Sequence, residues 1–161
     1  MVVENSLKVP QGILKNMNPE VFFWSNEVYE SLSNFTPVKI VINQKEYASV
    51  EHYYQSKKSE DPGEQELIRQ ASTAYKSKKL GSKVKFPRAD WDSYKIEVMT
   101  EALRLKFAQE PFKSLLLSTG EANIYEDSPY DLFWGTGALG SSGTGQNHLG
   151  KLLMKIRSEL N

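Results

Sequence analysis

The chain has 161 residues, with 20 basic and 20 acidic side chains and no cysteine. This length suits one domain, because folding then buries roughly 70% of the unfolded surface without further cross-links. A formal net charge of zero excludes an overall field that would attract nucleic acid, and the absence of cysteine excludes disulfides and thiolate metal sites. With no apolar run of membrane-spanning length and no leader pattern, we expect a cytoplasmic protein with no membrane partner.

The first part of the chain is expected to contain the little β structure that the protein has. Residues 1–20 lack a sustained period and contain Pro10 and Pro19, which predicts an irregular N-terminal arm. A strand is expected at Val21–Trp24, and residues 38–42 and 45–47 are expected to pair as a hairpin.

Helices are expected to dominate the rest of the chain. The signals are, in order, a cap at Ser49, a first-turn proline at Pro62, a closing glycine at Gly81, a cap at Asp90 or Asp92 before the shared face of Ile96, Met99, Leu103 and Phe107, a start at Phe112, and a cap at Asn147 before a final amphipathic helix. The fold class is therefore mainly α with a small β-hairpin or sheet near the N-terminus, in a single domain over residues 21–161.

A glycine-rich segment near the C-terminus is the first candidate for a binding loop. Asp131 and Trp134 stand beside Gly135 and Gly137, and further glycines lead to Asn147 at the start of the last helix. Glycines let main-chain N–H groups approach phosphate oxygens, and a helix N-terminus favours anions. We therefore expect this loop to hold a phosphorylated ligand that also carries a ring.

Several familiar patterns are present only as strings. Gly135-x-Gly137-x-x-Gly140 matches a dinucleotide fingerprint, but no alternation of strands and helices surrounds it. The two histidines, His52 and His148, are too few and too far apart for a His-rich metal site. We therefore expect no cofactor and no metal, which leaves carboxyl groups and a lysine as the candidates for any bond breaking.

Glu51, Gln55 and Lys58 have the spacing i, i+4, i+7 of one helical stripe. Glu51 would lie in the first turn, where the helix dipole favours its anionic form, so it is suited to activate water or to oppose a developing positive charge. The alternative is that Glu51 only stabilises the helix terminus, as acids in a first turn commonly do.

From Phe22 to the C-terminus the chain resembles the YbiA-like, or NADAR, family. The matching motifs are Ser33-Asn34-Phe35, Glu51 to Gln55, Lys58, Gly81, Arg88 with Trp91, the Met99 to Phe107 helix, Glu126, Asp131-x-x-Trp134-Gly135-x-Gly137, Asn147-x-Leu149-Gly150, and Leu153-Met154-x-x-Arg157. This resemblance implies a single-domain YbiA-like fold.

The resemblance also implies an N-glycosidase that hydrolyses the bond between ribose C1′ and an exocyclic amine. Its substrate would be ADP-ribose on the amino group of guanine, in DNA or a nucleotide, and we favour this slightly over ribosylaminopyrimidine phosphates, the early intermediates of riboflavin biosynthesis. A guanine-specific enzyme would be an antitoxin paired functionally with a DNA ADP-ribosyltransferase toxin.

Four residues are candidates for the chemistry. We expect Glu51 to stabilise the oxocarbenium-like charge, while Glu126 and Asp131 compete for the role of acid or base. Lys58 is either a phosphate clamp or a nucleophile that captures the ring-opened sugar as a Schiff base.

Ten further residues are candidates for ligand binding: Asn34, Phe35, His52, Gln55, Arg88, Trp91, Trp134, Gly135, Gly137 and Asn147. The two tryptophans are expected to stack on a base or ribose, although Trp91 suits core packing almost as well. Arg88, the glycine loop and Asn147 are expected to hold phosphate, with the alternative that Arg88 is only a surface residue.

A second class of function remains open, a module that binds ADP-ribose or NAD without turning it over. The glycine loop and the tryptophans would suffice for binding, and only the carboxyl groups argue for chemistry. An interaction scaffold would explain the helices but would leave residues 131–145 without a purpose.

Overall fold

The computed structural model describes residues 19–161, so the expected N-terminal arm lies outside the described residues except for Pro19 and Glu20. The elements are β1 (Glu20–Phe22), the 3-10 helix η1 (Glu27–Leu32), β2 (Ile40–Ile42), β3 (Lys45–Tyr47), α2 (Val50–Ser56), α3 (Pro62–Arg69), α4 (Ala74–Gly81), α5 (Trp91–Phe107), α6 (Phe112–Ser118), β4 (Asn123–Tyr125) and α7 (His148–Glu159). The expected class, mainly α with a little β structure, is confirmed.

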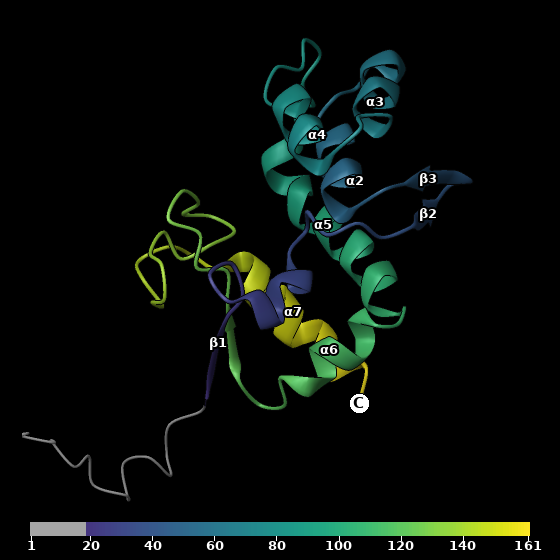
Figure 1. Ribbon diagram of the computed structural model, residues 1–161. Helices are drawn as coiled ribbons and strands as arrows, with labels where there is room; N and C mark the ends of the chain where they lie inside the picture. The colour runs from purple at the N-terminus through teal and green to yellow at the C-terminus, as the bar shows by residue number, and fades with distance from the viewer. Residues whose placement is uncertain (1–18) are drawn as a thin grey trace, which may run out of the picture.

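Two small sheets flank the helices. The expected hairpin is formed by β2 and β3, with Ile40 opposite Tyr47. The second sheet pairs β1 with β4 in parallel, with Val21 opposite Ile124, and this partner of β1 was not expected. A three-residue strand is too short to show an alternating pattern in the sequence. The pairing matters because it places the segment after β4 beside the segment after β1 (Figure 1).

Helix α2 is enclosed by its neighbours. It packs against α3, α4 and α5 (Figure 1). All seven of its residues are buried. Ser49 begins the helix as expected, since its hydroxyl accepts a hydrogen bond from the main-chain N–H of His52 at 3.1 Å. Because every face of α2 meets another element, its polar residues Glu51 and Gln55 lie inside the molecule.

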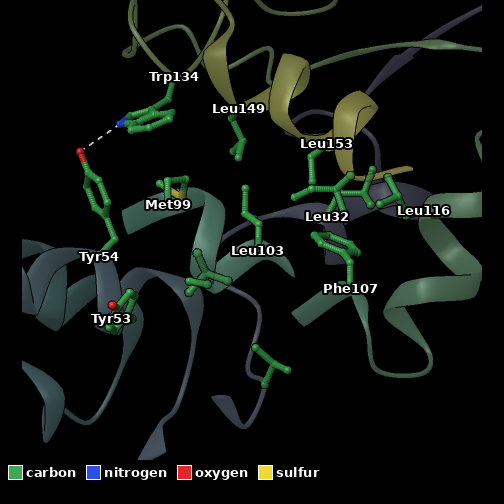
Figure 2. Close-up of a cluster of buried hydrophobic side chains, with 14 of the residues drawn as sticks. Leu32, Tyr53, Tyr54, Met99, Leu103, Phe107, Leu116, Trp134, Leu149 and Leu153 are labelled. Atoms are coloured by element: carbon green, nitrogen blue, oxygen red, sulfur yellow. Dashed lines mark hydrogen bonds between the residues drawn. The ribbon is translucent and has the colours of Figure 1, made fainter. Parts of the chain in front are cut away.

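The core joins α5, α7 and the segment that carries Trp134. Met99, Leu103 and Phe107 lie along α5 and face Leu149 and Leu153 of α7 (Figure 2). The expected apolar face of α5 is confirmed at these three α5 positions, whereas Ile96 at the start of the pattern is exposed. No helix within residues 19–161 is long and apolar enough to span a bilayer.

Three expected helix boundaries have a different physical basis from the one the sequence indicated. Gly81 is the last residue of α4 and not a left-handed cap beyond it. Asp90 precedes α5 without capping it, because its carboxylate binds the guanidinium of Arg88. Asn147 precedes α7 in the left-handed conformation. Its side chain does not cap the helix, because it is hydrogen-bonded to Ile124 of β4 and to Glu126, the residue that follows β4.

Candidate active site

A cavity of about 160 Å³ lies where α2, α4 and α5 meet the loop that follows β4. It is lined by Ser33, Asn34, Phe35, Glu51, Tyr54, Gln55, Lys58, Lys78, Met99, Glu126, Asp131 and Trp134. All four expected catalytic residues are among these, although they come from segments about 70 positions apart in the chain. The cavity is therefore the candidate active site.

Three carboxyl groups face this cavity. Glu51 comes from the first turn of α2, and its main-chain N–H donates to the carbonyl of Asn34 at 3.1 Å. Glu126 directly follows β4. The Oδ1 of Asp131 accepts the main-chain N–H groups of Phe133 and Trp134 at 2.9 and 2.8 Å, which fixes the orientation of that side chain.

Burial and neighbouring negative charges raise the pKa of two of these acids, Glu126 and Glu51. Burial, together with the charges of Asp131 and Glu51, raises the pKa of Glu126 to about 8. Burial also raises the pKa of Glu51, and the hydrogen bond from Gln55 opposes that rise without cancelling it. The helix dipole was expected to favour the anionic form of Glu51, but loss of hydration on burial acts in the opposite direction and raises its pKa.

Gln55 connects the helices around the acids. Its Nε2 donates to Oε1 of Glu51 at 2.6 Å, so the spacing of four residues places the two side chains together, as expected for one stripe. The amide fits because residue 81 is glycine: a Cβ there would lie 2.0 Å from Oε1 of Gln55. Gly81 is thus required by the crossing of α2 and α4, and not by a helix cap.

Three buried polar atoms of the cavity wall have no protein partner. Among the described residues, Oδ1 of Asn34, Oε1 of Gln55 and Oε2 of Glu126 are the buried side-chain nitrogen or oxygen atoms that make no hydrogen bond. Such atoms are uncommon in folded proteins, since each loses its hydration without compensation. Their occurrence around one cavity indicates a site that receives hydrogen bonds from a ligand.

Two lysines supply positive charge. Lys58 is half-buried, with Nζ 5.5 Å from the centroid of the Tyr54 ring, and burial lowers the pKa of its amine. Lys78 reaches the cavity from α4, with Nζ 5.6 Å from the centroid of Phe35. A phosphate entering the cavity would meet these two amines.

The aromatic wall consists of Trp134 and Tyr54. The indole Nε1 donates to the Tyr54 hydroxyl at 3.1 Å, and the rings meet edge to face with centroids 5.5 Å apart (Figure 2). Trp91 lies behind this wall, packed on Tyr54 at 5.0 Å, and does not line the cavity. The structure therefore places Trp134 at the site and gives Trp91 the packing position that was its alternative.

His52 and Arg88 lie away from the cavity. The ring nitrogens of His52 are within hydrogen-bond distance of the Ser49 hydroxyl at 2.7 Å and the Ala71 carbonyl at 2.9 Å, so the ring is engaged inside the fold. The guanidinium of Arg88 binds Asp90 and stacks on Tyr94 with 4.3 Å to the ring centroid. The main chain of Arg88 does contact a residue of the site, since its N–H donates a hydrogen bond to the carbonyl of Lys58 at 2.8 Å.

The glycine-rich loop shapes the site without forming the expected anion cradle. The N–H groups of Asn147, His148 and Leu149, at the start of α7, donate to the carbonyls of residues 133–135, so they are not available to phosphate. Gly135 packs between the acid-bearing segments, since a Cβ there would lie 2.7 Å from the Glu126 carbonyl and 3.0 Å from that of Asp131. Gly137, with φ of +70°, turns the chain.

Asn147 fixes Glu126 and does not reach the cavity. Its Oδ1 accepts the main-chain N–H of Glu126 at 3.0 Å, and its Nδ2 donates to the carbonyl of Ile124 at 2.9 Å. The carbonyl of Glu126 in turn accepts the N–H of Thr136 at 2.8 Å. Asn147, which was expected to bind phosphate, therefore acts as a clamp: its side chain holds the main chain on both sides of Tyr125 and so positions Glu126.

Sequence reasoning missed four residues of the lining, namely Ser33, Tyr54, Lys78 and Met99. Tyr54 and Met99 read as ordinary core positions, and they are core residues with one edge on the cavity. Lys78 stands in a lysine-rich helix where several cations look alike, and only the packing of α4 on α2 selects it.

Comparisons with known proteins identify the family of the chain. The profile of the NADAR domain matches residues 22–161, so the chain belongs to the NADAR domain family. It is 41% identical over 137 residues to an N-glycosidase of Nostoc punctiforme, covering 82% of this chain and 86% of that protein. It is 36% identical over 141 residues to the N-glycosidase YbiA of Escherichia coli, covering 86% of each chain.

A solved structure and a larger relative extend the comparison. An NMR structure of YbiA from E. coli superposes with a TM-score of 0.76 at 35% identity, covering 89% of this chain and 86% of that chain. A riboflavin biosynthesis protein of Vibrio vulnificus is 37% identical over 144 residues, which are 88% of this chain but 38% of that protein. The family and the YbiA-like fold expected from the sequence are confirmed, and the family includes N-glycosidases.

Proposed function

We propose that the chain is an N-glycosidase that hydrolyses the bond between ribose C1′ and an exocyclic amine. The observation that carries this proposal is the carboxyl group of Glu126, which holds a proton up to about pH 8 and stands on one small cavity with Glu51 and Asp131. Cleavage of such a bond needs a proton donor for the departing nitrogen and a carboxylate for the positive sugar. Relatives named N-glycosidases support the same class of reaction.

The roles follow from the environments of the acids. Glu126 donates its proton to the amine nitrogen as the C1′–N bond breaks, and the bonding electrons leave with that nitrogen. The carboxylate of Glu51, held by Gln55, stabilises the positive charge on C1′. A water molecule then adds its oxygen to C1′ and gives a proton to Asp131 or to the ionised Glu126. The products are a ribose hydroxyl and a free amine.

ADP-ribosylated guanine, in DNA or as a nucleotide, is the substrate that we propose first. The cavity adjoins a second, larger hollow, so the parts of a substrate on the two sides of the cleaved bond can occupy separate spaces. An enzyme of this specificity would reverse the modification made by a DNA ADP-ribosyltransferase toxin, and we propose that pairing as its functional context.

Ribosylaminopyrimidine phosphate is the second candidate. The inner cavity, at about 160 Å³, suits a sugar with one phosphate, and a relative is named as a riboflavin biosynthesis protein. Both substrates present the same bond to the acids and differ only beyond it.

Product release from matched substrates tests the proposal. An oligonucleotide bearing ADP-ribosylated guanine and a ribosylaminopyrimidine phosphate would be incubated separately with the protein in the presence of a chelator and followed by chromatography. We expect free ADP-ribose from the first, and its loss in Glu51→Gln and in Glu126→Gln. Cleavage of only the second substrate would make this an enzyme of metabolite clearance. Binding of both without cleavage of either would favour the binding module.

Lys58 allows an alternative mechanism through the same cavity. Burial lowers the pKa of its amine, and a neutral amine can attack the imine that forms when the sugar ring opens. Nζ forms a bond to C1′, and the amine of the base leaves as the bond between C1′ and its nitrogen breaks. Water then hydrolyses the Schiff base between Nζ and C1′, which frees the lysine and the sugar. Borohydride added during turnover would trap the lysine adduct as a stable mass increase on Lys58, whereas direct attack by water leaves the protein mass unchanged.

A further inference from the structure

Exposed aromatic side chains gather at the mouth of the candidate active site. A second hollow of about 340 Å³ adjoins the cavity, and Trp24, Phe35, Tyr75 and Tyr130 are its aromatic lining. Trp24 is 46% exposed, Tyr75 63% and Tyr130 87%. Large apolar surfaces left in water at one place mark sites that a ligand covers. We call these four residues the aromatic vestibule.

The aromatic vestibule has a rigid base. The carboxylate of Asp127 is fully buried, and its Oδ1 accepts the main-chain N–H of Trp24 at 2.9 Å. The Oδ2 accepts the N–H of Gly140 at 2.8 Å and the hydroxyl of Ser25. Trp24 also meets Tyr130 edge to face, with centroids 6.2 Å apart. Asp127 is the neighbour of Glu126, so the same short segment carries the proposed acid and holds the main chain of Trp24.

The two hollows meet at the acids. Glu126, Asp131 and Lys78 line both of them, whereas Glu51 and Lys58 line only the inner cavity. The bond that is cleaved must lie beside the acids, so one half of the substrate lies inside and the other half in the vestibule. The inner half faces hydrogen-bonding groups and Lys58, as a sugar phosphate requires. The outer half faces the four aromatic rings and two serines, with Lys78 and the two shared acids at its inner edge, and a planar group can stack on such rings.

We propose that the aromatic vestibule is a stacking subsite for the heterocycle that leaves, the ring whose exocyclic amine is bonded to the ribose. This rests on the proposed function and adds the orientation of the substrate: sugar inside, base outside. Trp24 and Tyr130 are its specificity-determining residues. Because the base lies at the mouth, its far edge faces solvent, and a free nucleotide and a base within a strand can present the same ring to the subsite.

Binding of the separate halves tests this orientation without relying on turnover. Guanosine, a diaminopyrimidine and ribose 5-phosphate would be titrated into the unaltered protein, Trp24→Ala, Tyr130→Ala and Trp24→Phe, followed by calorimetry and ligand-observed NMR. We expect each alanine variant to weaken binding of at least one heterocycle roughly tenfold and to leave ribose 5-phosphate unchanged. Trp24→Phe should keep most of the affinity. The preferred heterocycle would distinguish the two substrates.

Phe86→Ala is the matched control, because Phe86 is an aromatic residue of similar exposure, 57%, that does not line either hollow. Equal heterocycle affinity in the unaltered protein and both alanine variants would overturn the proposal, as would a loss confined to ribose 5-phosphate or the absence of heterocycle binding at millimolar concentration. Failure of the proposed function is separate: it would appear as no product from any substrate in the unaltered protein, whatever the heterocycle affinities are.

Discussion

Glu126 is a buried acid whose ionised form is disfavoured by its surroundings. Its Oε2 is buried without a hydrogen bond, and both neighbouring acids, Asp131 and Glu51, disfavour its charge. The unfolded chain would release this proton near pH 4.3, whereas the folded chain keeps it to about pH 8. Between these values the folded state holds more protons than the unfolded state, so the contribution of Glu126 to stability falls as pH rises.

Replacing Glu126 by glutamine should therefore separate stability from activity. We expect Glu126→Gln to raise the free energy of unfolding at pH 8 by roughly 1–3 kcal/mol, because the amide keeps its neutral form at no cost. Turnover should fall by about 10²–10⁴-fold, because the proton donor is lost. Denaturant titrations at pH 4 and pH 8, together with initial rates, measure both effects.

The unaltered protein provides the comparison for Glu126→Gln. Its turnover should decline above about pH 8, as Glu126 loses its proton. At pH 4 the carboxyl group of Glu126 is largely neutral in the folded and in the unfolded chain. The unaltered protein and Glu126→Gln should therefore have nearly equal free energies of unfolding at that pH. A glutamine variant that is less stable at pH 8, or that retains turnover, would contradict the assigned role.

Lys106 is a second buried ionisable residue, outside the cavity. It is fully buried in α5, its Nζ donates to the carbonyl of Ser33 at 2.7 Å, and burial lowers the pKa of its amine to about 7. The amine also lies 5.1 Å from the ring centroids of Phe107 and Phe112. Lys106 thus supports the segment from Ser33 to Phe35 that forms one wall of the site.

The folded protein should become more stable as pH rises from about 7 to about 10, because the unfolded chain still binds a proton at Lys106 there and the folded chain does not. Lys106→Met removes this dependence. The quantity to compare is the unfolding free energy of the variant minus that of the unaltered protein. We expect this difference to be roughly 2–4 kcal/mol more positive at pH 6.5 than at pH 10. Denaturation at the two pH values measures the difference, and a pH-independent difference would refute the assignment.

At the level of elements, the site depends on how closely α4 crosses α2. Gly81 ends α4 against the side chain of Gln55, whose amide holds Glu51. An added methyl group would lie 2.0 Å from Oε1 and 2.9 Å from Cδ of Gln55, so that side chain must move. The crossing therefore couples helix packing to the orientation of an acid in the cavity.

Gly81→Ala should reduce the catalytic rate without preventing folding. We expect the displaced amide of Gln55 to leave Glu51 without its donor and to reduce kcat/KM by about tenfold or more, while the protein still folds. Gly63→Ala is the matched control, since Gly63 lies in α3 and its methyl would meet only the side chain of Asp61. Equal rates in the two alanine variants would argue against the role of Gln55. Circular dichroism and initial rates decide between these outcomes.

At the level of the whole molecule, the absence of net charge predicts how a nucleic acid substrate would bind. With 20 basic and 20 acidic side chains, the protein has no field that would attract a long phosphate track. Contacts should be confined to the modified nucleotide, at the cavity and its mouth. A strand would then be recognised through one displaced base.

We expect kcat/KM on a modified oligonucleotide to fall less than tenfold between 50 and 200 mM salt, as for about one or two phosphate contacts. A fall of 10³-fold or more would indicate six or more such contacts and would contradict local recognition. A modified mononucleotide, measured over the same salt series, provides the control for effects on the chemical step.

The sequence by itself determined the features that depend on neighbouring residues. Ser49 capping α2, the apolar stripe of α5, and the placement of Glu51, Gln55 and Lys58 toward one side all follow from spacings within a few turns. The motifs from Phe22 onward also identified the family. These features could be predicted because helix periodicity and capping act over three to seven residues.

Only the tertiary structure decided what those residues meet. The pairing of β4 with β1 and the clamp from Asn147 bring Glu126 to the same cavity as Glu51, and the packing of α4 selects Lys78 from several lysines. The tertiary structure also engages the guanidinium of Arg88 with Asp90 and the first N–H groups of α7 with main-chain carbonyls, so these groups are not free to bind phosphate. Proximity of distant segments and the removal of water set the pKa of each acid, and neither quantity is contained in a local pattern.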